Sequence, residues 1–289
     1  MGVNYENALE IKGLRKNFKD FTLDNIDLVV PAGSIVGLIG ENGAGKTTTI
    51  KAAADLVHKD GGSVKFFGMN LSEDPVGIKE QLSLVFEDVY FNPILTITQT
   101  ENVLKNIYKT WDSNAWNSYI TRFNLPADKP IKEFSKGMQV KFNLAVALSH
   151  NARLLMLDEP TSGLDPVMRD EILDIFLDFI QDESRAILLS SHITTDLEKV
   201  ADYIAFIHSG KMIFFEKKDD LLNNYAIIRC STDDLAKISP SDKLAVRRQD
   251  YQCSVLVSDR HAAARKYPDF IIDAPAIDEI MLFYIKGEK

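Results

Sequence analysis

Residues 40–47 read Gly-Glu-Asn-Gly-Ala-Gly-Lys-Thr, which fits the pattern G-x-x-x-x-G-K-[ST] of a phosphate-binding loop. The loop follows a short apolar run, residues 34–39, that is typical of a buried parallel strand, and a helix is expected after it through about residue 56. Glycines let a backbone wrap closely around phosphates, and the amides at a helix N-terminus supply positive potential. The motif therefore predicts a nucleoside triphosphate site at one end of a parallel sheet.

Each residue of this loop is a candidate for contact with the nucleotide. Lys46 can reach the β- and γ-phosphates, and the hydroxyl of Thr47 can ligate Mg²⁺. The remaining expected contacts are Gly40, Glu41, Asn42, Gly43, Ala44, Gly45 and Thr48. The alternative interpretation is a plain glycine turn before a helix.

A second signal is the run Leu-Leu-Met-Leu-Asp-Glu at residues 154–159. An apolar strand that ends in a carboxylate places Asp158 at the carboxyl edge of the sheet, beside the phosphate loop, where a Mg²⁺ ligand belongs. Glu159 can then polarise a water molecule aimed at the γ-phosphate. Such a run alone occurs in many α/β proteins, so its functional interpretation depends on the phosphate loop upstream.

The segment Ser135-Lys136-Gly137-Met138-Gln139 precedes a predicted long helix and resembles the signature sequence of the ABC ATPase family. Ser135 and Gly137 match that motif, whereas Lys136 and Met138 stand where the commonest version has Gly and Gln. The resemblance implies that Ser135 and Gly137 contact the γ-phosphate of a nucleotide held by an opposite subunit. An isolated serine at this place would more often be a plain helix N-cap.

The resemblance to this family extends from residue 1 to about residue 225. Residues 160–165, Pro-Thr-Ser-Gly-Leu-Asp, look like the D-loop that lines the subunit interface, with Asp165 among the nucleotide-site residues. His192, after Ser190 and Ser191, looks like the switch histidine that contacts the γ-phosphate. Phe18 fits the aromatic residue that stacks on adenine; Phe21 is a weaker candidate, and either could be a core residue.

One position departs from the family pattern. The family usually has a glutamine at the end of the strand that enters the helical subdomain, and this sequence has Glu87 there. A carboxylate can still ligate Mg²⁺ together with Thr47 and Asp158, although it adds negative charge near the γ-phosphate. The alternative is that Glu87 is an exposed loop acid.

The expected fold class is α/β, a P-loop core of the ABC ATPase type in residues 1–225 with a helical subdomain inserted at about residues 88–150. Within the subdomain, residues 98–101 read as a capping box, after which Val103, Leu104, Ile107 and Tyr108 fall on one helix face. Residues 226–289 are expected to form a small accessory α+β domain with the order βαββαβ and a final helix.

Composition limits the class of partner. The chain of 289 residues has a formal charge of −9, which argues against nucleic-acid binding, because that needs Lys and Arg along a surface. No apolar run approaches the roughly 20 residues of a membrane span, and residues 1–10 do not resemble a signal peptide. Cys230 and Cys253 lack metal-ligand spacing and read as core thiols. We expect a cytoplasmic protein unless a partner holds it at a membrane.

The resemblance implies an ATP-hydrolysing subunit with ATP and Mg²⁺, a second ATP-binding subunit, a separate permease chain at the inner face of the membrane, and export as the favoured direction. The alternatives are an ABC ATPase that acts on ribosomes or DNA, and a non-catalytic regulatory subunit. The single set of motifs and the acidic charge disfavour the first alternative. The second is disfavoured by the intact catalytic residues Lys46, Asp158, Glu159 and His192. A docking surface is expected at Tyr90, Phe91, Trp111 and Trp116, unless these aromatics form the subdomain core.

Overall fold

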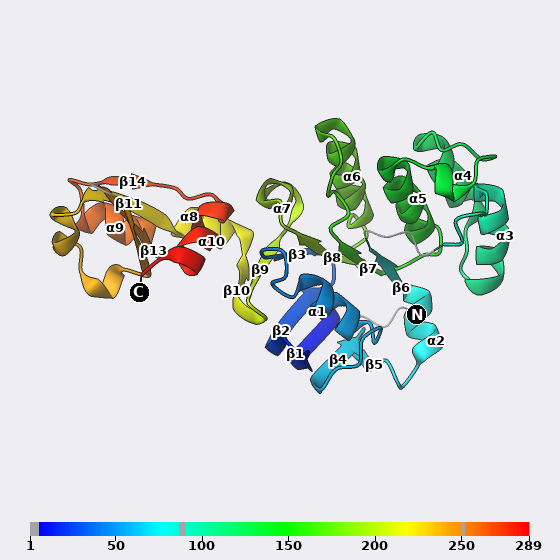
Figure 1. Ribbon diagram of the computed structural model, residues 1–289, viewed down its shortest axis with the longest axis horizontal. Helices are drawn as coiled ribbons and strands as arrows, with labels where there is room; N and C mark the ends of the chain where they lie inside the picture. The colour runs from blue at the N-terminus through cyan, green and yellow to red at the C-terminus, as the bar shows by residue number, and fades with distance from the viewer. Residues whose placement is uncertain (1–5, 87–90, 250–251, 289) are drawn as a thin grey trace.

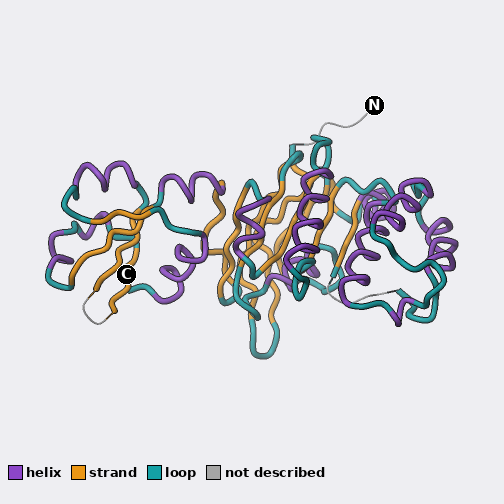
Figure 2. Tube along the Cα trace, turned by 90° about the horizontal axis from the view of Figure 1, so that it is seen from above, coloured by secondary structure: helices purple, strands orange, loops and turns teal. Residues whose placement is uncertain are grey.

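The structure is a computed structural model that describes residues 6–86, 91–249 and 252–288. Figure 1 shows an elongated molecule with a central body built on two sheets, a group of helices at one end and a small sheet domain at the other. The view from above in Figure 2 shows the same three parts in line. Within the described residues, no helix combines the length and the apolar character needed to span a bilayer.

The larger central sheet carries the site. In the described part of the chain it has six strands in the order β10-β9-β3-β8-β7-β6, all parallel except β10. Their bounds are β3 Ile35–Ile39, β6 Leu82–Val85, β7 Leu154–Asp158, β8 Ala186–Ser191, β9 Tyr203–His208 and β10 Lys211–Lys217. Every residue of β3, β7 and β8 is buried, as expected for strands covered on both faces. The loops after these three strands meet at one edge, because the strands are parallel neighbours.

A second, antiparallel sheet has the order β2-β1-β4-β5 in the described residues and faces helix α1 (Figure 1). Its strands are β1 Asn7–Asn17, β2 Thr22–Pro31, β4 Gly61–Phe66 and β5 Met69–Asn70, and α1 is Lys46–Ala53. One cluster of buried apolar side chains, including Ile11, Leu38 and Ile50, joins both sheets to α1. This packing holds the start of α1 at the carboxyl edge of the larger sheet.

The helical subdomain is built around buried aromatic rings. Its helices are α3 Ile97–Ile107, α4 Ser113–Arg122 and α5 Lys136–Leu148, and α2 Pro75–Gln81 leads into β6. Trp116 is only 1% exposed, and the rings of Trp116 and Phe91 both meet Phe142 edge-on. The ring centre of Trp111 lies 5.2 Å from that of Trp116. Of the two alternatives for these aromatics, Trp116 therefore follows the second and is a core residue of the subdomain; Tyr90 lies outside the described residues.

The N-terminus of α3 lies two residues before the predicted one. The capping box is formed by Thr96 and Gln99: the Thr96 hydroxyl accepts from the Gln99 amide, and the Gln99 side chain accepts from the Thr96 amide. The predicted apolar face holds only in part: Leu104 is buried and Tyr108 packs partly buried against the core, whereas Val103 and Ile107 are exposed. A capping box forms where the chain turns into the helix, and here the chain is still extended at Thr96, which pairs with Pro130 in an isolated β-bridge.

The C-terminal residues form a four-stranded antiparallel sheet in the order β12-β13-β11-β14 within the described chain. Its elements are β11 Ala226–Ser231, β12 Ala245–Gln249, β13 Gln252–Val257, α9 Arg260–Lys266, β14 Ile271–Asp273 and α10 Ile277–Lys286. This is the expected strand order, but the first helix is replaced by two 3-10 turns, Asp234–Lys237 and Pro240–Asp242. Cys230 and Cys253 are free, buried and directly opposite each other on β11 and β13.

Helix α10 returns to the central body. Its residues Ile280 and Phe283 belong to the same buried cluster as Phe206 and Phe214 of the larger sheet. The amide of Ile277 donates to a carboxylate oxygen of Glu198 on α7, Thr194–Val200, at 2.9 Å. The C-terminal domain is therefore packed onto the end of the sheet rather than joined by a free linker.

Candidate nucleotide site

The phosphate loop joins β3 to α1 and is bent as a phosphate-binding turn requires. Gly45 has a φ of 116°, and a Cβ there would lie 3.0 Å from the side chains of Leu23 and Phe21, so only glycine fits. Glu41, Asn42 and Gly43 are exposed, Thr47 and Thr48 are half-buried, and Gly40, Ala44 and Gly45 are buried. Gly45 provides no side-chain cap for α1, which leaves the first amides of the helix for an anion.

Lys46 folds back over this loop. Its Nζ donates to the carbonyl oxygen of Gly40 at 2.8 Å and to that of Glu41 at 3.3 Å. The same Nζ lies 3.1 Å from Oε1 of Glu159. The side chain is buried, so its charge acts at short range on whatever occupies the loop.

Asp158 lies beside Thr47 as the sequence predicts. Its Oδ2 accepts from the Thr47 hydroxyl at 2.8 Å, and its Oδ1 accepts from the Ser190 hydroxyl at 2.6 Å. Among the described residues, no group of three His, Cys, Asp or Glu side chains could hold a metal by itself. A hydroxyl and one carboxylate fit Mg²⁺, which is usually bound by one or two carboxylates together with substrate phosphates. Glu87, the third expected ligand, lies outside the described residues.

Glu159 lies between the phosphate loop and the residues that follow β8. Its backbone has a φ of 53°, and its amide donates to the backbone oxygen and the hydroxyl of Ser190 at 3.2 and 3.1 Å. Oε2 lies 2.6 Å from Nδ1 of His192 and accepts from the His192 amide at 3.2 Å. Oε1 has no well-aligned donor among the described residues, so its contact with Lys46 is an ion pair. The predicted catalytic residues Lys46, Glu159 and His192 therefore form one contiguous group.

Ser135 and Gly137 of the signature segment lie at the start of α5, near α6 and away from the Lys46–Glu159–His192 group. The Ser135 hydroxyl accepts from the Met138 amide and caps α5, and a Cβ on Gly137 would lie 2.6 Å from the sulfur of Met168. Asp165 caps α6, Pro166–Phe179, by accepting from the Val167 and Met168 amides. The contacts found for Ser135, Gly137 and Asp165 are thus with α5 and α6, and not with the phosphate loop of the same chain.

The two candidate aromatics differ in exposure. Phe18 is 46% exposed, and its ring centre lies 6.3 Å from that of Phe21. Phe21 is partly buried and supports the phosphate loop at Gly45. Phe18 is the more exposed of the pair, and the Lys16 ammonium lies 5.6 Å from its ring centre.

Two further residues contact the loop and were missed in the sequence. The amide of Gly210 donates to the Ala44 carbonyl at 2.9 Å, and Nδ1 of His208 lies 3.7 Å from Oε2 of Glu41. Both follow from the pairing of β9 with β3, which brings the end of β9 beside the loop. No local motif marks them; only the strand order does.

Comparison with known proteins agrees with this geometry. A sequence profile of the family described as "ABC transporter" matches residues 23–162. The lantibiotic transport ATP-binding protein SrtF of Streptococcus pyogenes is 33% identical over 225 residues, which cover 75% of this chain and 96% of SrtF. The bacitracin transport ATP-binding protein BcrA of Enterococcus faecalis is 31% identical over 72% of this chain and 68% of BcrA.

A solved structure described as "Structure of ATP binding subunit of ABC transporter" has the same fold. It matches with a TM-score of 0.68 and 27% sequence identity, over 74% of this chain and 91% of that chain. The expected fold class, a P-loop core with a helical subdomain and a small C-terminal domain, is confirmed. The chain therefore belongs to the ABC transporter family, as one of its ATP-binding, ATP-hydrolysing subunits.

Proposed function

We propose that this chain is one subunit of a two-chain, Mg²⁺-dependent ATPase that drives export through a separate permease. The observation that carries the proposal is the position of Glu159, between Lys46 at 3.1 Å and His192 at 2.6 Å, next to the Asp158–Thr47 pair. These side chains come from the start of α1, from the end of β7 and from the residues that follow β7 and β8, all at one edge of the sheet. Such an arrangement suits hydrolysis of a phosphate bond at the open end of the phosphate loop.

The chain's own groups divide the work. Lys46 would neutralise charge on the terminal phosphates, and Glu159 would orient and deprotonate the attacking water. His192 fixes the Glu159 carboxylate from the other side. Asp158 and Thr47 would hold Mg²⁺, which when bound neutralises the developing negative charge on the phosphate oxygens.

A second ATP-binding subunit would complete the site. Ser135 and Gly137 begin a helix that contacts α6 and not the phosphate loop of its own chain. A helix N-terminus is suited to bind an anion, so these residues can serve a nucleotide on a facing chain. The partner could be a second copy or a related chain.

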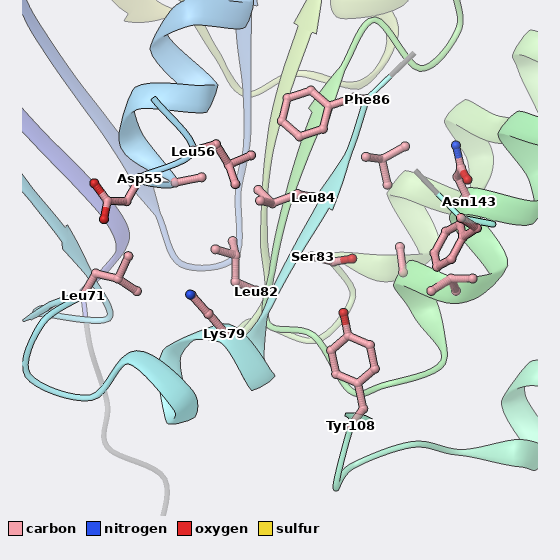
Figure 3. A pocket seen from close by; sticks show the side chains of 15 residues that line it. Asp55, Leu56, Leu71, Lys79, Leu82, Ser83, Leu84, Phe86, Tyr108 and Asn143 are labelled. Carbon is pink, nitrogen blue, oxygen red and sulfur yellow. The ribbon is translucent and has the colours of Figure 1, made fainter. Parts of the chain in front are cut away.

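The permease would dock beside the outer strand of the larger sheet. A cavity of 390 Å³ spans β6, with Ala54 to Leu56 at the end of α1 on one side and Asn143 to Ala147 of α5 on the other. Figure 3 shows Leu82 and Leu84 on the α1 side of the strand and Ser83 on the α5 side. Leu56 and Ile107 are large apolar side chains exposed nearby. An amphipathic segment of a membrane partner fits such a groove.

Export as the direction rests on the relatives, since SrtF and BcrA are named for lantibiotic and bacitracin transport. Through such a permease this chain would sit at the cytoplasmic face of the membrane. The acidic charge of −9 continues to disfavour nucleic acid as a partner.

The substitution Glu159→Gln tests the function. It keeps the shape of the side chain but removes the base, so ATP binding should persist while hydrolysis slows on the order of 10²-fold. ATP turnover and ATP-dependent association are measured for the wild type, for Glu159→Gln and for the exposed control Glu183→Gln. Turnover by Glu159→Gln at the wild-type rate would refute the role of Glu159, and no turnover by the wild type with its partners would refute the function.

A further inference from the structure

A buried carboxylate lies behind the catalytic group. Asp196, in the first turn of α7, is 3% exposed, and its Oδ2 accepts from the hydroxyl of Thr161 at 2.7 Å. Thr161 is 1% exposed. Nε of Arg169, on α6, lies 3.9 Å from the same oxygen. Burying a carboxylate is costly unless it is paired, so this contact is well defined and difficult to exchange for water.

The Thr161–Asp196 bond connects the segment after Glu159 to the helix after His192. Thr161 follows Glu159 by two residues, within the segment 160–165, and Asp196 follows His192 by four residues. The loops are therefore joined twice, by the Glu159–His192 contact at the exposed end and by the Thr161–Asp196 bond behind it. Arg169 also braces the segment, because its Nη2 donates to the Leu164 carbonyl at 3.4 Å.

We propose that Thr161 and Asp196 are positioning residues that carry movement of the segment 160–165 to His192 and Glu159. The inference rests on the two-chain motor proposed above, in which that segment meets the partner chain. Because the bond is buried, segment 160–165 and α7 shift together, and closure of the partner against the segment sets the distance between Glu159 and His192. Loss of the bond would leave ATP binding intact and misplace the pair during hydrolysis.

A surface contact between the same two helices provides the matched control. Lys199 of α7 lies 3.1 Å from Asp174 of α6, and both side chains are solvent-exposed. Exposed ion pairs contribute little to stability or to rigidity. Asp174→Asn removes this pair without touching the buried one, so it should leave turnover unchanged.

The test measures kcat and KM for ATP, the ATP affinity of the isolated chain and the midpoint of thermal unfolding. Thr161→Val keeps the volume but lacks the hydroxyl, and we expect kcat to fall about tenfold while KM changes less than about twofold. Thr161→Ser restores the donor and should keep kcat within about threefold of the wild type. All assays are run well below the unfolding midpoint of each variant.

Asp196 supplies a second route to the same conclusion if Thr161→Val folds poorly. Asp196→Asn keeps an oxygen acceptor and should retain kcat within about threefold, whereas Asp196→Ala should lose about as much as Thr161→Val. The double variant Thr161→Val/Asp196→Ala should be no slower than either single variant, because both remove one contact.

Three results would overturn the proposal: a normal kcat in folded Thr161→Val, an equal loss of ATP affinity in the isolated chain, or losses that multiply in the double variant. None of these depends on the outcome for Glu159→Gln. Failure of the inference is therefore separable from failure of the proposed function.

Discussion

Glu159 shows how a strained residue is held at the centre of the site. A φ of 53° lies in the left-handed region, which costs a residue with a side chain roughly 1–2 kcal/mol. The backbone bonds to Ser190 and the side-chain contacts to Lys46 and His192 hold it there. With this backbone conformation the carboxylate reaches across the sheet edge to Lys46 in the phosphate loop. The position of this one side chain thus depends on Lys46 at the start of α1, on Ser190 in β8 and on His192 after β8.

The exposed Phe18 yields a prediction for nucleotide affinity. Because its ring is 46% exposed, Phe18→Ala should weaken ATP binding by about 0.5–1.5 kcal/mol, which is the range for aromatic stacking, and leave the unfolding midpoint unchanged. Phe18→Trp should preserve affinity. Phe21→Ala is the contrasting variant: it removes a partly buried ring beneath Gly45 and should lower the unfolding midpoint. Unchanged ATP affinity in Phe18→Ala, measured by titration, would reject the stacking role.

At the scale of elements, His150 joins the helical subdomain to the central body. It follows α5 and is buried, its ring stacks on Tyr108 at 4.0 Å, and its Nδ1 lies 3.3 Å from the Glu80 carbonyl of α2. The Glu80 carboxylate in turn accepts from the Lys109 amide and the Thr110 hydroxyl. Burial lowers the pKa of His150, because the charged imidazolium is poorly solvated there, although the Glu80 carbonyl and carboxylate oppose the effect.

This lowered pKa predicts a pH-dependent stability. The unfolded chain has a histidine pKa of about 6.5, so below that pH it binds a proton that the folded state binds less readily. The ionisation of His150 therefore leaves the free energy of unfolding unchanged above about pH 7.5 and lowers it as the pH falls through 6.5. The unfolding midpoint should drop more between pH 7.5 and 5.5 in the wild type than in His150→Phe. The exposed control His58→Gln should follow the wild type, and equal slopes in all three proteins would contradict the prediction.

At the scale of the whole molecule, the proposed function assigns two half-sites to each chain. Lys46, Asp158, Glu159 and His192 are together at the sheet edge, while Ser135 and Gly137 begin a helix packed on α6. The C-terminal domain does not separate from this body, because α10 shares the core with β9 and β10 through Phe283, Phe206 and Phe214. The catalytic unit we infer is therefore an assembly of complete chains.

Mixing two inactive chains tests this arrangement. Lys46→Ala and Ser135→Arg should each abolish turnover alone, and their mixture should restore one composite site in which intact Lys46 faces intact Ser135. Recovery should reach about a quarter of wild-type activity if the chains pair at random and each composite site works alone. The control mixes Lys46→Ala with the double variant Lys46→Ala/Ser135→Arg, which cannot form such a site. No recovery from two folded, associating chains would argue against completion across the interface.

Local features were predictable because they depend on neighbours in the sequence. The loop at residues 40–47 and the strand that ends in Asp158 carry their chemistry in consecutive residues. Residues 135–139 resemble the signature sequence of ABC ATPases and so indicated the family. The same reasoning failed at α3, where the capping box is formed by Thr96 and Gln99 and not by residues 98–101. It left open whether Trp116 lies at the surface or in the core, because the burial of this residue depends on how α4 meets α5.

The sequence by itself determined the kind of site: a phosphate loop, a carboxylate strand and a histidine that follows another strand, each recognisable in a short run of residues. Only the tertiary structure decided which of these meet. The Lys46–Glu159–His192 group, the approach of His208 and Gly210 to the loop, and the buried Thr161–Asp196 bond all depend on the order β9-β3-β8-β7. Buried parallel strands are apolar throughout, so their sequences do not encode which strand lies beside which; the packing of the whole core does.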